Sequence, residues 1–271
     1  MTQQYKQYKS SGNDKMIFSN LRLRNIQPMC PICGMSGRAF TPLPQAHREQ
    51  ALKYGYPYMG KGETISLETY GCPQCNASDR ERLYAHWLQI WIDAAILGRN
   101  IRVIHFAPEH MLSTYIQQLK LFEQYETADL MMENVTHRHV DLMQLPFAAN
   151  TYDFLLCSHV LEHVPDDAKA LQELYRILKP GGAGLIMAPI IPELPMTIED
   201  PAETSAEVRW RRFGQDDHVR LYAHDDYVRR IENAGFAVKQ FGVDYFGSDT
   251  FTALGLKASS LLYVALKPVV V

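Results

Sequence analysis

One stretch of the sequence, residues 152–182, constrains the fold more than any other. It reads YDFLLCSHVLEHVPDDAKALQELYRILKPGG and opens on an apolar run without alternation, which is typical of a central strand covered on both faces. Apolar residues at helical spacing then predict a helix over 167–179. Pro180 and the two glycines after it are expected to end that helix, because proline cannot continue it and glycine accepts a positive φ. A strand, a helix and a sharp exit in one run indicate an α/β domain.

The rest of residues 101–271 also alternates between strand-like and helix-like segments, which gives the fold class α/β. The last two predicted strands are expected to form a hairpin added antiparallel at the edge of the sheet. Strands are predicted at 102–106, 125–128, 138–140, 154–158, 183–188, 237–243 and 261–266, and further helices at 111–119 and 224–234.

Composition divides the chain into four parts. Residues 1–27 read as a polar, flexible tail, and residues 28–77 form a small module rich in Pro, Gly, Cys and Tyr. Residues 78–98 are predicted to be a linking helix, which Ser78 caps with Glu81 in the capping-box position. An apolar face that includes Leu83, Trp87 and Trp91 is expected to dock the module onto the main domain, residues 99–271.

Four of the five cysteines form two pairs, Cys30-Pro-Ile-Cys33 and Cys72-Pro-Gln-Cys75. Paired CxxC motifs in a chain without an export signal favour metal over disulfides. The pattern resembles a zinc ribbon, in which two tight turns aim four thiolates at one structural Zn²⁺. Reduced cysteines without a ligand are the main alternative, and iron is another. Cys157 is interpreted as a small core residue.

Residues 101–271 resemble a class I S-adenosylmethionine-dependent methyltransferase of the type-11 kind, most closely in the 152–182 stretch. The resemblance implies a Rossmann-like, seven-stranded methyltransferase sheet. It also implies that S-adenosylmethionine lies across the carboxyl ends of the first strands, where open α/β sheets bind ligands. The residues that it assigns to the cofactor are His105, Ala107, Glu109, Asp129, Asp141, Leu142, Ser158 and His159.

Three of these assignments have specific roles. The resemblance gives Asp129 both ribose hydroxyls, Asp141 the adenine amino group and Leu142 the face of the ring. A turn or helix-capping aspartate is the alternative at position 129, and an ordinary turn before Pro146 is the alternative at position 141.

The first strand-to-helix turn departs from the pattern of most relatives. They carry Asp-x-Gly-x-Gly-x-Gly, whereas this chain has His-Phe-Ala-Pro-Glu-His from His105 and no glycine. Glu109 stands where a carboxylate could hold the cofactor's amino group. A similar HFAPE turn, with CSHVLEHVPDD and FGQxDH strings, occurs in a subgroup of uncharacterised and polysaccharide-associated methyltransferases. The departure affects the expected cofactor affinity more than the cofactor's identity.

Histidines are the candidate bases, because a hydroxyl or amine acceptor must lose a proton during transfer. His218 is the predicted base, and His159 is expected to face cofactor or substrate. Glu162 and His163 are interpreted as local hydrogen-bonding residues. The segment 190–224 is long for a link between a strand and a helix, which favours a binding loop or lid. Arg209, Arg220 and Tyr222 within it are predicted to contact the substrate; a solvated surface loop with a short helix is the alternative.

The leading hypothesis is methyl transfer to a polar small molecule or saccharide precursor. A zinc ribbon before a methyltransferase domain is also similar to bacterial 23S ribosomal RNA guanine methyltransferases, but a net charge of −3 gives RNA weak support. A degenerate methyltransferase fold that only binds ligands is the third hypothesis, motivated by the missing glycines. The sequence lacks an apolar run long enough for a membrane span, and its polar N-terminus lacks the apolar core of an export signal. A cytoplasmic location is therefore the default.

Overall fold

The computed structural model describes residues 26–95, 101–120, 122 and 124–269. Nearly all of the predicted tail, residues 1–27, lies outside these ranges. So do residues 96–100, which the sequence assigned partly to the linking helix.

A seven-stranded sheet forms the centre of the molecule, in the order β3-β2-β1-β4-β5-β9-β8. Neighbouring strands from β3 to β5 run parallel. β9 runs antiparallel to both β5 and β8, which confirms the predicted antiparallel pair at the edge of the sheet. The two strands are joined by residues 242–261, which include two short helices, and not by the tight turn of a hairpin. The strands are β1 (Arg102–Phe106), β2 (Gln124–Asp129), β3 (His137–Arg138), β4 (Tyr152–Ser158), β5 (Leu178–Met187), β8 (Ala237–Phe241) and β9 (Leu262–Leu266).

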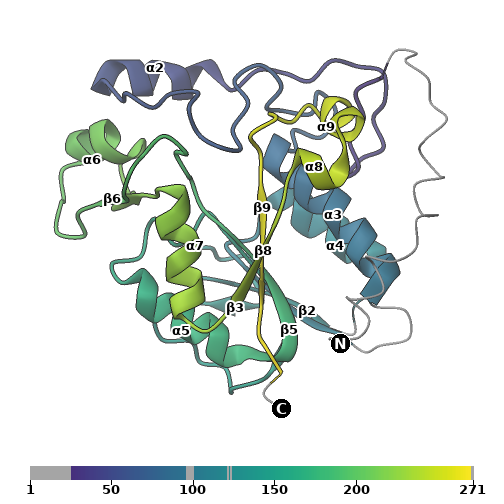
Figure 1. Cartoon of the computed structure of the whole chain (residues 1–271), viewed down its shortest axis with the longest axis vertical. Coiled ribbons are helices and arrows are strands. Elements are labelled where there is room, and N and C mark those ends of the chain that lie inside the picture. The colour runs from purple at the N-terminus through teal and green to yellow at the C-terminus, as the bar shows by residue number, and fades with distance from the viewer. Residues whose placement is uncertain (1–25, 96–100, 121, 123, 270–271) are drawn as a thin grey trace.

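Helices cover the sheet from two sides (Figure 1). α3 and α4 lie together on one side, and α5 and α7 lie together on the other. Central strand β4 is buried on both faces, because Phe154 packs against Trp91 of α3 while Leu155 and Cys157 are also fully buried. The helices around the sheet are α3 (Asp79–Ala95), α4 (His110–Leu119), α5 (Asp167–Ile177), α7 (His224–Asn233), α8 (Val243–Phe246) and α9 (Ser248–Leu254).

The predicted linking helix is α3, which forms part of the main domain's core. Trp87 and Trp91 stack on each other, and both rings pack on Phe154 of β4. The predicted capping box is confirmed, because the Glu81 carboxylate accepts from the Ser78 amide and hydroxyl at 2.8 Å each. The Glu81 amide in turn donates to Ser78 Oγ at 3.3 Å. α3 therefore belongs to the α/β domain as its first covering helix.

The exit from α5 differs from the prediction. The helix ends at Ile177, and Leu178 already has the extended conformation that opens β5. Lys179 precedes Pro180, and the residue before a proline is disfavoured in the α region, so the helix ends before the proline itself. Gly181, at φ 80°, lies within β5, where the register against β4 shifts. Pro180, Gly181 and Gly182 therefore lie in the first part of β5, after the helix has already ended.

The segment 190–224 has secondary structure of its own. It contains β6 (Ile198–Glu199) and β7 (Arg220–Leu221), which pair antiparallel, and α6 (Ala206–Phe213). α6 contacts α2 (Gln45–Tyr54) of the N-terminal module, where the Tyr54 ring stacks on Trp210 with centroids 5.9 Å apart. The segment thus bridges the module and the sheet, as the upper left of Figure 1 shows.

Candidate functional site

The turn after β1 keeps a left-handed backbone although it contains no glycine. Ala107 has φ 45°, and its amide donates to Ala128 of β2 at 2.9 Å. His159, the first residue after neighbouring β4, has φ 57°. Such a conformation costs an L-residue about 1–2 kcal/mol. Two strained turns thus lie side by side at the carboxyl edge of the sheet. In many proteins, backbone strain of this kind occurs at functional sites.

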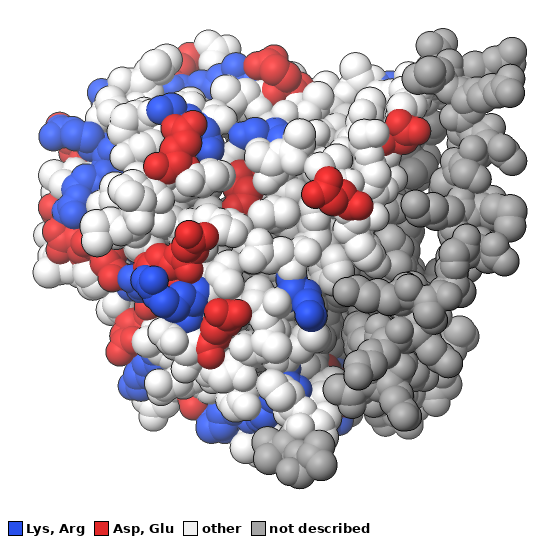
Figure 2. Space-filling view, in the orientation of Figure 1, with Lys and Arg blue, Asp and Glu red and all other residues white. Residues whose placement is uncertain are grey.

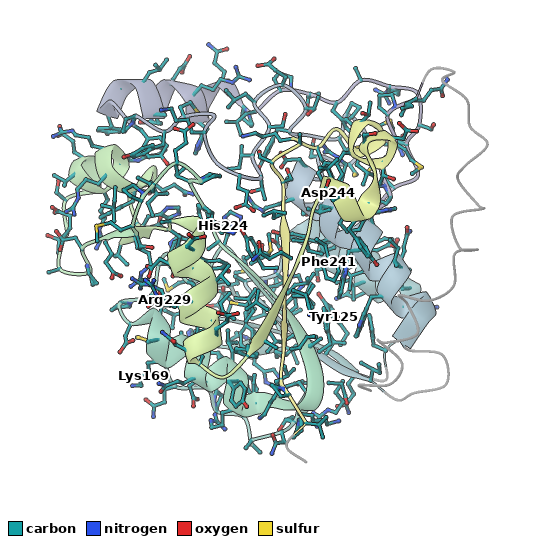
Figure 3. The ribbon with its side chains drawn as sticks, in the orientation of Figure 1. Tyr125, Lys169, His224, Arg229, Phe241 and Asp244 are labelled. Atoms are coloured by element: carbon teal, nitrogen blue, oxygen red, sulfur yellow. The ribbon has the colours of Figure 1, made fainter. Side chains whose placement is uncertain are left out.

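A chain of polar groups follows the same turn. The His105 ring is fully buried, and its Nδ1 lies 2.8 Å from the hydroxyl of Tyr125, a β2 residue labelled in Figure 3. His105 Nε2 lies 2.9 Å from Glu109 Oε2. Burial opposes ionisation of Glu109, but the hydrogen bond with His105 and the charges of His105 and Arg80 lower its pKa to about 2. Glu109 is therefore a carboxylate at neutral pH.

Arg80 of α3 also belongs to this group, although no motif in the sequence indicates it. Its Nε lies 3.9 Å from Glu109 Oε1. Both atoms are buried, and neither has a hydrogen-bond partner among the described residues. An ammonium beside Glu109 and a carboxylate beside Arg80 would satisfy them, so the pair suits a zwitterionic amino-acid group. Only the three-dimensional packing of α3 brings Arg80 here, since the methyltransferase resemblance begins after that helix.

The aspartates assigned to the cofactor both support turns. Asp129 Oδ1 accepts from the amides of Met131 and Met132 at 2.6 Å each. Asp141 Oδ1 accepts from the Met143 amide at 2.8 Å. One oxygen of each aspartate therefore stabilises a turn, as the alternative interpretation expected. The ribose and adenine contacts stay predictions for the other oxygen of Asp129 and of Asp141. Leu142 is buried in the main core.

Ser158 ends β4 in the interior. Its hydroxyl lies 3.2 Å from that of Tyr84 of α3, a second contribution of this helix to the same edge of the sheet. Ser158 and Tyr84 are both nearly inaccessible to solvent. The cofactor contact predicted for Ser158 therefore stays a prediction.

The two predicted bases lie near one another on either side of Glu162. His159 Nδ1 is 3.2 Å from Glu162 Oε1, and His218 Nε2 is 4.0 Å from the same oxygen. Burial lowers the pKa of His159, and it lowers the pKa of His218 to about 4. Both rings are therefore neutral at pH 7 and have a free lone pair. Their catalytic roles stay predictions.

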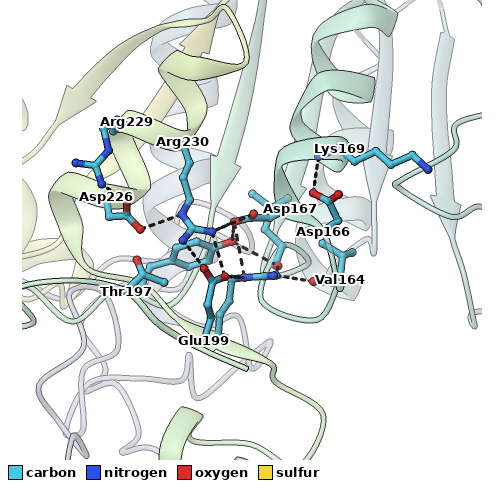
Figure 4. Close-up of polar contacts among 12 residues, drawn as sticks. Val164, Asp166, Asp167, Lys169, Thr197, Glu199, Asp226, Arg229 and Arg230 are labelled. Carbon is cyan, nitrogen blue, oxygen red and sulfur yellow. Dashed lines mark hydrogen bonds and ion pairs between the residues drawn. The ribbon is translucent and has the colours of Figure 1, made fainter. Parts of the chain in front are cut away.

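Two of the three predicted substrate residues lie in the interior. Arg220 is 1% exposed, and its guanidinium donates to the carbonyls of Leu161, Val164 and Pro165. The Tyr222 hydroxyl donates to Asp167 at 2.7 Å. These bonds indicate a structural role, although the substrate contacts themselves stay predictions. In Figure 4, Asp167 and Glu199 also receive the Arg230 guanidinium, which completes the network.

Arg209 lies nearer the surface, on α6. Its Nε donates to the Glu203 carbonyl at 2.8 Å, and one terminal nitrogen lies 3.4 Å from the Asp216 carbonyl. These contacts brace the loop around α6. Of the three residues assigned to the substrate, Arg209 is the one that the structure leaves partly accessible.

The four paired cysteines converge on one point. Sγ of Cys30 lies 3.8 Å from Sγ of Cys75, and Sγ of Cys33 lies 3.7 Å from Sγ of Cys72. A tetrahedral Zn²⁺ with bonds of about 2.3 Å places its sulfurs about 3.8 Å apart, so the spacing fits zinc. The two turns are alike: the Gly34 amide donates to the carbonyl oxygen of Cys30, and the Asn76 amide donates to the carbonyl oxygen of Cys72. Both residues have positive φ, which glycine and asparagine adopt most readily.

Residues 108–186 match the protein family described as a methyltransferase domain. A demethylmenaquinone methyltransferase of Staphylococcus aureus is 43% identical over 65 residues, which are 24% of this chain and 27% of that protein. The chain thus spans about a quarter of the length of this curated relative.

Similar solved structures include an S-adenosylmethionine-dependent methyltransferase from Mesorhizobium loti. The two sequences are 14% identical, the alignment covers 67% of this chain and 97% of the Mesorhizobium loti chain, and the TM-score is 0.44. Another is phosphoethanolamine N-methyltransferase 2 from Haemonchus contortus, 15% identical over 68% of this chain and 53% of that chain, with a TM-score of 0.44.

The matched region and the order of the sheet define the class. Residues 108–186 run from the turn after β1 into β5, so the match covers β2, β3, β4 and most of β5 but begins after β1 itself. Over residues 108–186 the chain carries a methyltransferase domain. The seven-stranded sheet around it has the antiparallel edge pair that the resemblance to class I S-adenosylmethionine-dependent methyltransferases predicted. No helix in the parts of the chain that the structure describes is long and apolar enough to cross a membrane.

Proposed function

We propose that this protein transfers a methyl group from S-adenosylmethionine to a polar small-molecule or sugar-type acceptor. The observation that carries the proposal is the pair Glu109 Oε1 and Arg80 Nε, which are buried at the carboxyl edge and without a hydrogen-bond partner among the described residues. This pair complements the amino-acid end of the cofactor, and it lies beside β1 and β4, where sheets of this kind bind ligands.

The remaining cofactor residues extend from this pair along the edge of the sheet. We assign the free oxygen of Asp129 to the ribose hydroxyls, because β2 ends beside β1. Asp141 follows β3, the next strand outward, and we assign it to the adenine amino group. Ala107 lets the backbone approach the ligand, since its side chain is small and its φ is already positive.

The reacting methyl group is activated by the cofactor's sulfonium charge, so the protein's part is to position the acceptor and exclude water. His159 is the candidate base for a hydroxyl or amine acceptor. It follows β4 directly, is 12% exposed, and its Nε2 is buried without a hydrogen-bond partner in the described structure. Since burial keeps the ring neutral at pH 7, Nε2 can accept a proton.

The acceptor side is assigned to the segment 190–224, which follows β5. A hollow of about 340 Å³ opens there, a size suited to a small polar molecule. On the face shown in Figure 2, basic and acidic side chains are interspersed, so this face offers no continuous surface for a nucleic-acid backbone. The hollow of about 340 Å³ is lined by Pro192, Leu194, Pro195, Ala223, His224 and Asp225.

The cysteine cluster is assigned to a structural Zn²⁺. Its four thiolates fill a tetrahedral coordination sphere, which leaves no position for a reacting group. Phe40, Ala51, Cys30 and Cys72 are among the few buried apolar side chains of the module. Such a small core needs a further source of stability, and metal binding supplies it.

Calorimetric titration with S-adenosylmethionine tests the cofactor site. We expect Asp129→Ala to weaken binding about tenfold to hundredfold, because the ribose hydroxyls lose a charged acceptor worth about 1.5–3 kcal/mol. Glu232→Ala is the matched control. Glu232 is an exposed carboxylate of α7, next to the amino end of β8 and so at the opposite edge of the sheet.

Absence of heat with the unchanged protein would support the degenerate, binding-only hypothesis. Equal affinity of the wild-type protein and Asp129→Ala would remove the ribose assignment while leaving the fold intact. If the cofactor binds, transfer of a labelled methyl group to saccharide precursors and to RNA then separates the acceptor classes. RNA binding would weaken steeply as salt is raised, whereas binding of a neutral sugar would not.

A further inference from the structure

A second cluster of metal-type ligands lies apart from the cysteines, just beyond the end of β4. Glu162 and His163 belong to the loop between β4 and α5, and His218 precedes β7 in the segment 190–224. Glu162 Oε1 is 4.0 Å from Nε2 of His163 and 4.0 Å from Nε2 of His218. One ligand atom from each residue lies within 4.8 Å of the other two.

The centre of this cluster is polar, buried and unsatisfied. The side chain of Glu162 is 0% exposed and that of His218 is 3% exposed. Three buried atoms have no partner with hydrogen-bond geometry among the described residues: both carboxylate oxygens of Glu162 and Nε2 of His218. His159 Nδ1, 3.2 Å from Oε1, is the one nearby donor among the described residues, and it leaves Oε2 unsatisfied. A buried carboxylate with so few donors costs several kcal/mol, and folded proteins rarely leave one in that state. A positively charged ligand would remove this cost.

The far side of each imidazole is already held. His218 Nδ1 lies 3.2 Å from the carbonyl oxygen of Phe213. His163 Nδ1 lies 3.2 Å from the Asp217 carboxylate. A carbonyl or carboxylate on one ring nitrogen fixes the tautomer that presents the other nitrogen to a metal, and metal-binding histidines almost always have such a partner. Both free Nε2 atoms face the same carboxylate.

We propose that Glu162, His163 and His218 bind a divalent transition-metal ion. Two imidazoles and a carboxylate suit Zn²⁺, Fe²⁺ or Co²⁺ better than Mg²⁺ or Ca²⁺, which prefer oxygen ligands. Bonds of about 2.0–2.2 Å to a tetrahedral ion place its ligands about 3.4 Å apart. Each 4.0 Å separation therefore closes by well under 1 Å when the ion binds.

Hydrogen bonds to the backbone hold the chain on both sides of the cluster, and the network of Figure 4 lies next to them through Val164. The Val219 amide donates to the Glu162 carbonyl at 2.9 Å, which joins the two ligand-bearing segments next to His218. Arg220 binds the carbonyls of Leu161 and Val164 on either side of Glu162 and His163. This arrangement explains the burial of Arg220, because it positions the loop that carries two of the ligands.

Three protein ligands leave coordination positions open, as in sites where metals bind substrates. His159, the candidate base, lies 3.2 Å from Glu162 through its Nδ1, so the ion would lie next to the proposed methyl-transfer site. An acceptor oxygen bound to the ion would lose its proton more readily. Binding of the ion itself does not depend on the proposed methyl transfer, so the two proposals can fail separately.

Cobalt titration of the full-length protein tests the site. The cysteine cluster is first loaded with one equivalent of Zn²⁺, and Co²⁺ is then added. We expect one further equivalent to bind with visible d–d absorption and without the strong near-ultraviolet thiolate band that cobalt would give at the cysteines. Glu162→Gln and His163→Ala should each weaken this binding at least tenfold. Asp217→Asn should weaken it about tenfold by releasing the ring of His163.

His110→Ala is the matched control, since His110 is an exposed histidine of α4, and it should bind Co²⁺ like the wild-type protein. His163 is about one-third exposed, so its variant is expected to fold, and a melting curve checks this. Binding of no Co²⁺ beyond the cysteine cluster would overturn the proposal. Equal binding by folded His163→Ala and the wild-type protein would also overturn it.

Discussion

At the scale of single residues, Glu63 is a carboxyl group that the fold holds away from water. It is 2% exposed, and the Tyr263 hydroxyl of β9 lies 2.8 Å from one of its oxygens. Burial raises the pKa of Glu63 from 4.5 to about 7, against the opposing effects of Tyr263 and Lys257. The folded state therefore binds a proton that the unfolded chain has released between these two pH values. This contribution to stability is complete below pH 4.5 and is lost as the pH rises through 7.

We expect Glu63→Gln to raise the free energy of unfolding by about 1–3 kcal/mol at pH 8, because a neutral amide needs no proton and still accepts from Tyr263. At pH 5 the variant and the wild-type protein should be nearly equal. Urea unfolding at the two pH values measures the difference. Glu68→Gln, whose side chain is 77% exposed, should change neither value. A Glu63→Gln protein that is less stable at pH 8 would contradict the assignment.

The turn after β1 has a backbone conformation typical of glycine although it contains no glycine. The missing glycines suggested weakened cofactor binding, yet Ala107 has the positive φ that glycine would adopt. Short-range sequence patterns count glycines, whereas the conformation here is imposed by the Ala107 bond to Ala128 and by the strands on either side. Glu109 could be proposed from its place in the turn. Arg80 could not, because its contact with Glu109 depends on tertiary packing.

At the scale of secondary-structure elements, the Glu81 carboxylate caps two helices. One oxygen accepts from Ser78 at the start of α3, and the other accepts from the Leu112 amide in the first turn of α4 at 3.3 Å. We expect Glu81→Ala to lower the free energy of unfolding by about 2–3 kcal/mol, because buried amides of both helices lose their acceptor. Urea unfolding, with hydrogen exchange at the two amides, measures this loss.

Glu81→Gln is the matched control for that experiment. Glutamine also serves in a capping box, so this variant should keep most of the stability and most of the amide protection. A change of less than about 0.5 kcal/mol for Glu81→Ala would indicate that water replaces the carboxylate at both helix ends.

The elements differ in how far the sequence alone could place them. The sheet strands and the α3 capping box were predicted because their signals are local: apolar runs, helical spacing and a Ser-x-x-Glu motif. The end of α5 was placed late because Pro180 and its glycines were taken as a helix stop, whereas Leu178 already pairs with Tyr152 of β4. β6 and β7 were missed, and α6 was anticipated only as a short helix without a position, because these elements are short and are held by partners remote in sequence, such as Tyr54 and Glu162.

At the scale of the whole molecule, the N-terminal module is joined to the α/β domain by buried hydrogen bonds. The Arg82 guanidinium is fully buried and donates to Thr69, Tyr70 and Ala77 of the module and to Leu254 of α9. A bond between Lys257 and the Gly60 carbonyl adds to this interface. Loss of metal from the cysteine cluster should therefore reach beyond residues 28–77, into the start of α3 and the chain around α9.

Removal of the metal with a chelator tests this coupling. We expect the purified protein to contain zinc at the cysteine cluster, and we expect chelation, or Cys33→Ser, to lower the melting temperature by several degrees. Hydrogen exchange should quicken over residues 28–77 and around Leu254, while β1 and β4 stay protected because their bonds lie within the sheet. Cys157→Ala is the control, since Cys157 lies in the core of β4 and should leave the zinc content of the cysteine cluster unchanged. A purified protein with no metal at these cysteines would contradict the zinc assignment. Faster exchange confined to residues 28–77 would show instead that the Arg82 bonds do not couple the module to the domain.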